Sequence, residues 1–219
     1  MKFNETVSIL NRYSIDNGSI QYIGDIPVFE GKIRKANASI VQDELKQALD
    51  KFQEEDGFKP HPVWKSHQLS DVHFNNNFLT TYNCNLMFEE IRNACSAYVA
   101  AIGSDPTWQF SLMQSWLTRT GHREYAHIHN HGYSQISGAY YIDTIGDDGD
   151  IYFPYPHIST SNSIFLQHLM KSLDIRPENG KLILFPGWLM HGVRTNTTEH
   201  NRISLSFNIQ MLPPGFKTP

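Results

Sequence analysis

The sequence has little cysteine. Cys84 and Cys95 are the only two in 219 residues. Both lie in one helical-looking segment, where eleven residues at a rise of about 1.5 Å each hold them about 16 Å apart. A disulfide between them is therefore not expected, and its absence fits a reducing compartment.

The sequence also lacks long hydrophobic runs. The first residues, MKFNETVSILNRYS, contain no apolar core of signal-peptide length, and apolar runs such as Leu182 to Phe185 are far too short to span a bilayer. We expect a soluble, cytoplasmic protein with no membrane partner.

Positive charge is not in excess. Eighteen Lys and Arg face twenty-two Asp and Glu, a formal net charge of −4, which leaves no broad basic field for a phosphate backbone. Nucleic acid is not an expected partner. The chain also has no GxSxG, Walker or CxxC motif, so it gives no support to a serine hydrolase, a P-loop NTPase or a zinc ribbon.

What is present predicts a mainly β protein with N-terminal α-helices. A length of 219 residues with 40% hydrophobic content favours a single domain over 1–219. Apolar residues at helical spacing predict one helix from an N-cap at Ser39 to Gly57 and another from about Asn85 to Ile102, closed by Gly103. Residues 1–105 are thus expected to be a helical support region.

Residues 106–212 differ in composition, because short segments rich in β-branched and aromatic residues alternate with residues typical of turns. This half is predicted to form a β-barrel or sandwich. Residues 59–78 read as a surface loop that includes His61, His67 and His73, and the stretch 157–171 as a short helix. The predicted strands are WQFSLMQSWLT, ISGAYYIDT, DIYFPYP, GKLILFPG, WLMHGVRT and RISLSFNIQ.

Histidine is the unusual residue, because four of the eleven fall between His122 and His131. His127, His129 and His131 alternate with other residues, and an extended chain would point all three imidazoles to one face. Imidazole is the commonest metal ligand, although a polar strand end would also account for the pattern. A metal site would need a further ligand, for which His191 is the candidate.

The order of these motifs resembles the iron(II)- and 2-oxoglutarate-dependent oxygenases. The segments HNHGYSQISGAYY, GKLILFPGWLMH and RISLSFN, within roughly 115–209, are similar to an oxygenase subfamily common in marine bacteria and cyanophages. The resemblance implies a double-stranded β-helix, the jelly-roll of cupin-like proteins. It also implies Fe(II) as cofactor, 2-oxoglutarate as co-substrate, and the cytoplasm of a host cell if a phage encodes the chain.

Carried over residue by residue, the resemblance implies that His129, His131 and His191 are metal ligands and catalytic residues. Arg202 matches the residue that pairs with the distal carboxylate of 2-oxoglutarate, and Ser204 matches a residue whose hydroxyl helps to bind the same carboxylate. The implied reaction uses O₂ to hydroxylate a C–H bond of a protein side chain or a small molecule, with release of succinate and CO₂.

The chain departs from the family pattern, in which a carboxylate stands where this sequence has His131. His127 with His129 is therefore an alternative ligand pair, and Asp143 an alternative source of a carboxylate. Two other functions stay open: a three-histidine iron dioxygenase that does not use 2-oxoglutarate, and a catalytically silent β-helix used as a binding module. A homodimer through the N-terminal helices is the default expectation.

Two further interpretations concern polar and aromatic residues. The acidic run at 146–150 reads as a solvated turn rather than a calcium site. Trp116, Tyr140 and Tyr141 are expected to belong to the core, although one inward tyrosine could reach the co-substrate.

Overall fold

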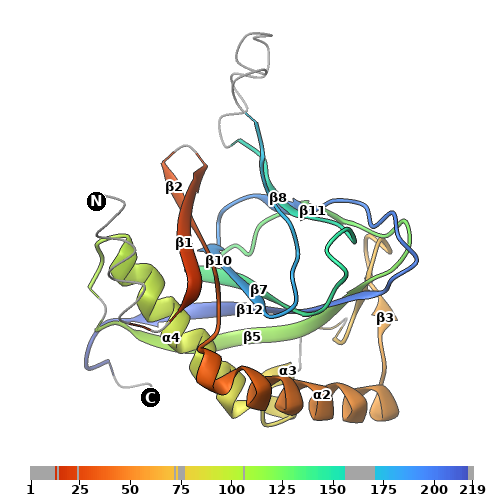
Figure 1. Ribbon diagram of the computed structural model, residues 1–219, viewed down its shortest axis with the longest axis horizontal. Coiled ribbons are helices and arrows are strands. Elements are labelled where there is room, and N and C mark those ends of the chain that lie inside the picture. The colour runs from red at the N-terminus through yellow and green to blue at the C-terminus, as the bar shows by residue number, and fades with distance from the viewer. Residues whose placement is uncertain are drawn as a thin grey trace.

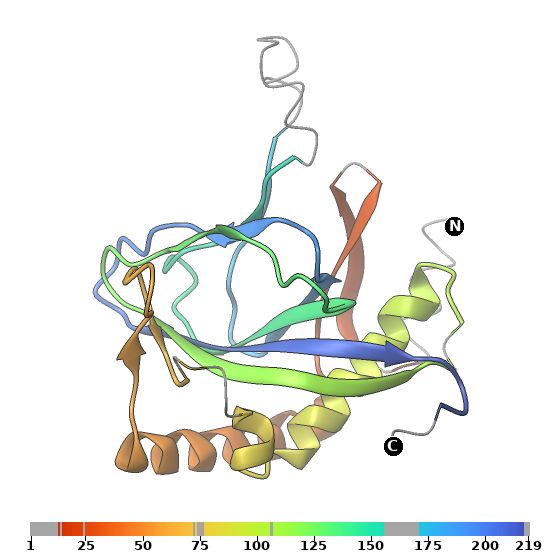
Figure 2. The ribbon, with the colours of Figure 1, turned by 180° about the vertical axis from the view of Figure 1, so that it is seen from behind.

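Two antiparallel β-sheets face each other in the computed structural model, which describes residues 13, 15–23, 25–71, 73, 77–105, 107–155 and 171–216. Figures 1 and 2 show the four-stranded sheet above the long strands of the eight-stranded sheet. This arrangement confirms the predicted mainly β fold with a double-stranded β-helix core. Within the described residues, no helix has the length and apolar character needed to cross a membrane.

The strand order of each sheet brings distant parts of the sequence together. The eight-stranded sheet runs β1 (Asp16–Ile23), β2 (Ile26–Lys32), β10 (Lys181–Pro186), β7 (Ile136–Asp143), β12 (Arg202–Leu212), β5 (Gln109–Thr120), β4 (Gln68–Leu69), β3 (Lys59–Pro60). The four-stranded sheet runs β6 (Ala126–His129), β11 (His191–Val193), β8 (Ile151–Phe153), β9 (Leu173–Ile175).

The eight-stranded sheet buries side chains on both of its faces. Successive residues of a strand point to opposite faces, so Leu182 and Leu184 of β10 join the cluster that packs against the helices. Ile183 and Phe185 join a second cluster between the two sheets. One strand thus contributes side chains to both hydrophobic clusters. Phe185, in the cluster between the sheets, also lines the cavity described below.

Two long helices cover the outer face of the eight-stranded sheet (Figure 1). Helix α2 spans Ala38–Glu55 and α4 spans Asn85–Ala101, with the short α3 at Phe78–Thr81 between them. Their apolar stripes, which include Leu45 and Ile91, are fully buried. Both predicted helices are confirmed.

The ends of the helices differ slightly from the prediction. A 3₁₀ turn at Lys35–Asn37 leads directly into α2, so the N-cap is Asn37 and not Ser39. At the other ends, Gly57 and Gly103 adopt the positive φ angles of 69° and 83° that glycine accommodates without strain.

The N-terminal half is less purely helical than predicted. Strands β1 and β2 extend the large sheet beside β10, and β3 and β4 extend its other edge, within the segment 59–78 that was predicted to be a loop. Each of β3 and β4 is only two residues long, too short to produce a readable alternation. The predicted helix at 157–171 lies almost entirely outside the described residues. Cys84 and Cys95 are both buried and free, as expected.

A buried carboxylate ties the 3₁₀ turn to α4. The side chain of Glu90 has no exposed surface, and its oxygens accept hydrogen bonds from the backbone N–H and Nε of Arg34 and from Nδ2 of Asn37. Burial alone would raise the pKa of Glu90, but these bonds outweigh it and hold the pKa below its ordinary value. A carboxyl with a lowered pKa in the folded state adds stability above its unfolded pKa, and that stability is lost as pH falls through the folded value.

We expect Glu90→Gln to lower the free energy of unfolding by about 2 kcal/mol at pH 7, because it removes one partner of a buried pair whose other member, Arg34, is partly hydrated. Denaturant titrations at pH 7 and at pH 3 measure this, and the difference between wild type and variant should shrink at the lower pH. Glu89→Gln is the matched control, since Glu89 pairs with Arg92 at the exposed surface and should contribute less than about 0.5 kcal/mol.

Candidate metal centre

Three histidines, from strand β6, the loop that follows it and the neighbouring strand β11, converge at one end of the space between the sheets. His129 is the last residue of β6, His131 lies two residues beyond, and His191 begins β11 directly opposite His129 in the strand register. One ring nitrogen from each lies within 4.8 Å of the other two. Their ring centroids are 4.4 to 5.1 Å apart.

Hydrogen bonds to the backbone fix the orientation of two of these rings. Nδ1 of His129 lies 2.7 Å from the carbonyl oxygen of His127, and Nδ1 of His191 lies 2.9 Å from that of Leu189. Because a carbonyl oxygen only accepts, each Nδ1 carries the hydrogen and each Nε2 presents a lone pair. This second layer of contacts is typical of histidines that bind a metal through Nε2.

The three imidazoles are held in the neutral form that a metal requires. Burial lowers the pKa of His131 to about 3, with a further contribution from His129. Burial and its two neighbours hold the pKa of His191 well below its ordinary value. Nε2 of His131 and Nε2 of His191 are 3.2 Å apart. Two ring nitrogens are this close only when a hydrogen or a metal ion lies between them.

The alternative ligands lie outside this group. His127 is exposed, and its ring packs against Trp64 and Tyr125, so the three imidazoles of the motif do not share one face as expected. The pairing of β6 with β11 shifts in register between His129 and Ala126, and such an irregularity breaks the alternation. The carboxylate of Asp143 lies 3.3 Å from Nε2 of His200 instead. Among the described residues the group contains no carboxylate.

Arg202 is a buried cation at the other end of the cavity, with 2% of its surface exposed. Nη1 donates to the carbonyl oxygen of Gly149, and Nη2 donates to Oγ1 of Thr120 at 3.0 Å. Its Nε is buried without a partner, and no carboxylate of the described chain forms an ion pair with it. Desolvation accordingly lowers the pKa of Arg202. An anion would satisfy both the charge and the free donor.

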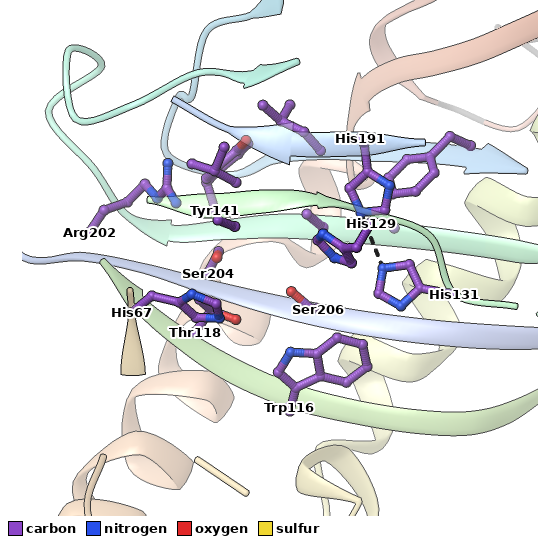
Figure 3. Close-up of a pocket in the computed structure, with 16 residues that line it drawn as sticks. His67, Trp116, Thr118, His129, His131, Tyr141, His191, Arg202, Ser204 and Ser206 are labelled. Carbon is purple, nitrogen blue, oxygen red and sulfur yellow. Dashed lines mark hydrogen bonds between the residues drawn. The ribbon is translucent and has the colours of Figure 1, made fainter. Parts of the chain in front are cut away.

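The floor between the histidines and Arg202 consists of two paired strands (Figure 3). Arg202, Ser204 and Ser206 alternate along β12 and line the cavity with Trp116 and Thr118 of β5, which face Ser206 and Ser204 across the register. The cavity has a volume of about 80 Å³. The hydroxyl groups of Thr118, Ser204 and Ser206 thus lie between the histidine nitrogens that could bind a metal and the buried guanidinium of Arg202.

Sequence reasoning missed several residues of this cavity. His67, expected at the surface, is 5% exposed and lines the cavity (Figure 3). Trp116 and Tyr141 are buried, as expected, and both also line the cavity, so Tyr141 is the inward tyrosine for which the sequence allowed. Outside the cavity lining, Asp148, expected in a solvated turn, is fully buried and accepts a hydrogen bond from Oγ1 of Thr144. The strand alternation places Tyr140 and Tyr141 on opposite faces, but the sequence does not reveal which face holds the cavity.

Gly187 allows the two histidine-bearing loops to approach closely. The backbone N–H of His131 donates to the carbonyl oxygen of Gly187 at 2.8 Å. A Cβ atom added at Gly187 would lie 2.1 Å from the carbonyl oxygen of Ser134, so it would push the loops apart. The position of His131 therefore depends on the absence of a side chain at 187.

We expect Gly187→Ala to weaken metal binding by about 10- to 100-fold, the usual loss when the support of a ligand is disturbed. Isothermal titration with Fe(II) under anaerobic conditions measures the change. Trp188→Ala is the control in the same loop, because Trp188 is 54% exposed and its truncation adds no atom between the loops. An unchanged affinity in Gly187→Ala would show that the loop spacing does not position the ligands.

Comparisons with known proteins agree with this geometry. Residues 114–208 match a family model described as "Putative 2OG-Fe(II) oxygenase". No curated protein sequence matches the chain.

Solved structures of low sequence identity share the fold. The α-ketoglutarate-dependent epimerase SnoN of nogalamycin biosynthesis has 8% identity and a TM-score of 0.62, over 94% of this chain and 83% of that one. A prolyl-4-hydroxylase of Pseudomonas putida has 11% identity and a TM-score of 0.55, over 94% and 98%. HygX of Streptomyces hygroscopicus, solved with nickel, 2-oxoglutarate and hygromycin B, has 14% identity and a TM-score of 0.53, over 98% and 88%.

Proposed function

We propose that the chain is a 2OG-Fe(II) oxygenase, in which His129, His131 and His191 bind Fe(II) and Arg202 binds the distal carboxylate of 2-oxoglutarate; residues 114–208 match the model of that family. The observation that carries the proposal is the pairing of three converging neutral imidazoles with a buried, unpaired arginine in one cavity. Neither the three histidines alone nor the buried arginine alone would favour this chemistry so specifically.

The residues of the cavity fit both groups. Two of the histidines offer Nε2 lone pairs because their Nδ1 atoms are tied to the backbone. The free Nε of Arg202 suits a carboxylate, and Ser204, two residues further along β12 in the same lining, offers a hydroxyl as a second donor. Thr120 and Gly149 hold the guanidinium so that it does not have to reorganise when the anion binds.

When bound, Fe(II), 2-oxoglutarate and O₂ supply the oxidising chemistry, in which a substrate C–H becomes C–OH and 2-oxoglutarate becomes succinate and CO₂. The chain orients the co-substrate along the floor of β5 and β12 and keeps water from the reacting end with Trp116 and Phe185. We propose hydroxylation as the reaction and either a protein side chain or a small molecule as the substrate. A cytoplasmic location and a homodimer stay predictions.

One observation favours a second candidate, an iron dioxygenase that does not use 2-oxoglutarate. The metal group contains no carboxylate among the described residues, so three neutral ligands would leave the full charge of the ion uncompensated. The buried Arg202 argues against this candidate, because a reaction without a dianionic co-substrate would leave that cation unpaired.

The test is an anaerobic titration of the apoprotein with Fe(II) and then with 2-oxoglutarate, followed by visible absorption. We expect a charge-transfer band when 2-oxoglutarate binds the metal, and succinate formation when O₂ is admitted. Bound iron with no band and no succinate would contradict the proposal and favour the second candidate.

A further inference from the structure

His67 is a buried, hydrogen-bonding side chain that the proposed reaction does not use. It lies just before β4, is 5% exposed, and lines the cavity beside Thr118, on the Arg202 side (Figure 3). In the register of β4 and β5, Gln68 faces Arg119 and Leu69 faces Thr118. Continuing that register by one residue places His67 beside Thr120, the residue that also holds Arg202.

The tautomer of His67 follows from its contacts. Nδ1 lies 3.2 Å from the carbonyl oxygen of Tyr125 and 3.2 Å from Oγ of Ser66. Because the carbonyl oxygen only accepts, Nδ1 carries the hydrogen. Nε2 is then a lone pair, and it has no partner within the part of the chain that the structure describes. Burial, with a smaller contribution from His61, lowers the pKa of His67 to about 4, so the ring is neutral near pH 7.

A network of rings holds His67 in this position. The ring of His61 stacks on Trp64 at 4.5 Å and lies 5.0 Å from the ring of His67. Trp64 in turn packs edge-on against His129 at 5.1 Å. The backbone N–H of His61 donates to the carbonyl oxygen of His67 at 2.8 Å, which closes the turn. The acceptor is therefore preorganised at a fixed place relative to the metal group.

The remaining lining limits what His67 can meet. Arg202 is the single fully charged side chain in the described lining, which includes no Asp, Glu or Lys. A lone pair at Nε2 repels a carboxylate, so the co-substrate's anionic end belongs with Arg202 and not with His67. The group that meets Nε2 must donate a hydrogen, and the positive charge of Arg202 in the same lining disfavours a cationic donor.

We infer that Nε2 of His67 accepts a hydrogen bond from an uncharged hydroxyl or amide N–H of the primary substrate, and that it thereby selects substrates with such a group. This inference rests on the proposed function, because it takes Arg202 to be occupied by the co-substrate. His67 is in this sense a positioning residue that sets the distance between the donor group and the carbon that is oxidised.

The test uses Zn(II)-loaded full-length protein with 2-oxoglutarate, labelled with ¹⁵N at histidine, and two pairs of probes: benzyl alcohol with benzyl methyl ether, and acetamide with N,N-dimethylacetamide. We expect the ¹⁵N spectrum of His67 to show hydrogen at Nδ1 alone. The donor of each pair should bind about 3- to 10-fold more tightly than its methylated partner, the contribution of one hydrogen bond. Only the donors should shift the Nε2 resonance.

Two variants separate the acceptor from the shape of the wall. His67→Gln keeps an acceptor and should keep the preference for donors, whereas His67→Leu should remove it, with 2-oxoglutarate binding unchanged in both. Equal response to the members of each pair in the wild type, or a hydrogen at Nε2 of His67 with or without 2-oxoglutarate, would overturn the inference. If 2-oxoglutarate does not bind the metal-loaded protein at all, it is the proposed function that fails.

Discussion

Replacing His191 with alanine should abolish 2-oxoglutarate turnover and weaken Fe(II) binding by more than about 100-fold. Loss of a residue that merely supports a ligand costs about 10- to 100-fold, so loss of a ligand should cost more. His191 is 4% exposed, and its ring lies 4.4 Å from that of His129 and 5.0 Å from that of His131, so its loss opens the group on one side. Anaerobic Fe(II) titration and a succinate assay measure the two effects.

His127→Ala is the matched control, because His127 belongs to the same motif but packs outside the group against Trp64 and Tyr125. We expect its Fe(II) affinity to stay within a few-fold of wild type. His131→Ala, by contrast, should behave like His191→Ala. The opposite result, with His127 required and His131 dispensable, would make His127 and His129 the ligand pair and refute the proposed set.

Replacing Arg202 with methionine should raise the dissociation constant for 2-oxoglutarate by about 30-fold or more, because loss of one partner of a buried charged pair costs at least ~2 kcal/mol. The affinity for Fe(II) should not change, since Arg202 lies at the far end of the cavity (Figure 3). Without 2-oxoglutarate the variant should unfold at the same temperature as wild type or higher, because it no longer buries a cation that lacks an anionic partner.

Arg194→Met is the control for this substitution. Arg194 is exposed, pairs with Asp174 at 3.0 Å and covers the ring of Tyr152, so its loss should leave 2-oxoglutarate binding unchanged. Titration of the Fe(II)-loaded proteins and thermal unfolding of the apoproteins are the measurements. An unchanged dissociation constant in Arg202→Met, together with a lower unfolding temperature, would show that Arg202 is a structural residue.

Sequence reasoning predicted the elements whose periodicity is long. Helices α2 and α4 and the long strands β5 and β12 repeat their pattern over many residues, and the structure confirms them. The convergence of His129, His131 and His191 was also foreseen, because two of them are adjacent in the motif. Their role as ligands, and those of Arg202 and Ser204, stay predictions.

The missed residues share a physical cause. His67 directly precedes β4, a strand too short to show alternation, and its burial comes from residues distant in the sequence such as Tyr125. Asp148 lies in an acidic run that looks solvated, yet Thr144 and the backbone of Ile145 satisfy its carboxylate in the interior. Local composition reports polarity, whereas burial of a polar group depends on partners that only the tertiary structure supplies.

The two-faced packing of β10 constrains how the chain can change length. An insertion of one residue within the strand would exchange its faces, sending Ile183 and Phe185 toward the helices and Leu182 and Leu184 toward the other sheet. An insertion of two residues would restore the alternation. Length variation among homologues should therefore be confined to loops, or occur in steps of two within the strands of the eight-stranded sheet.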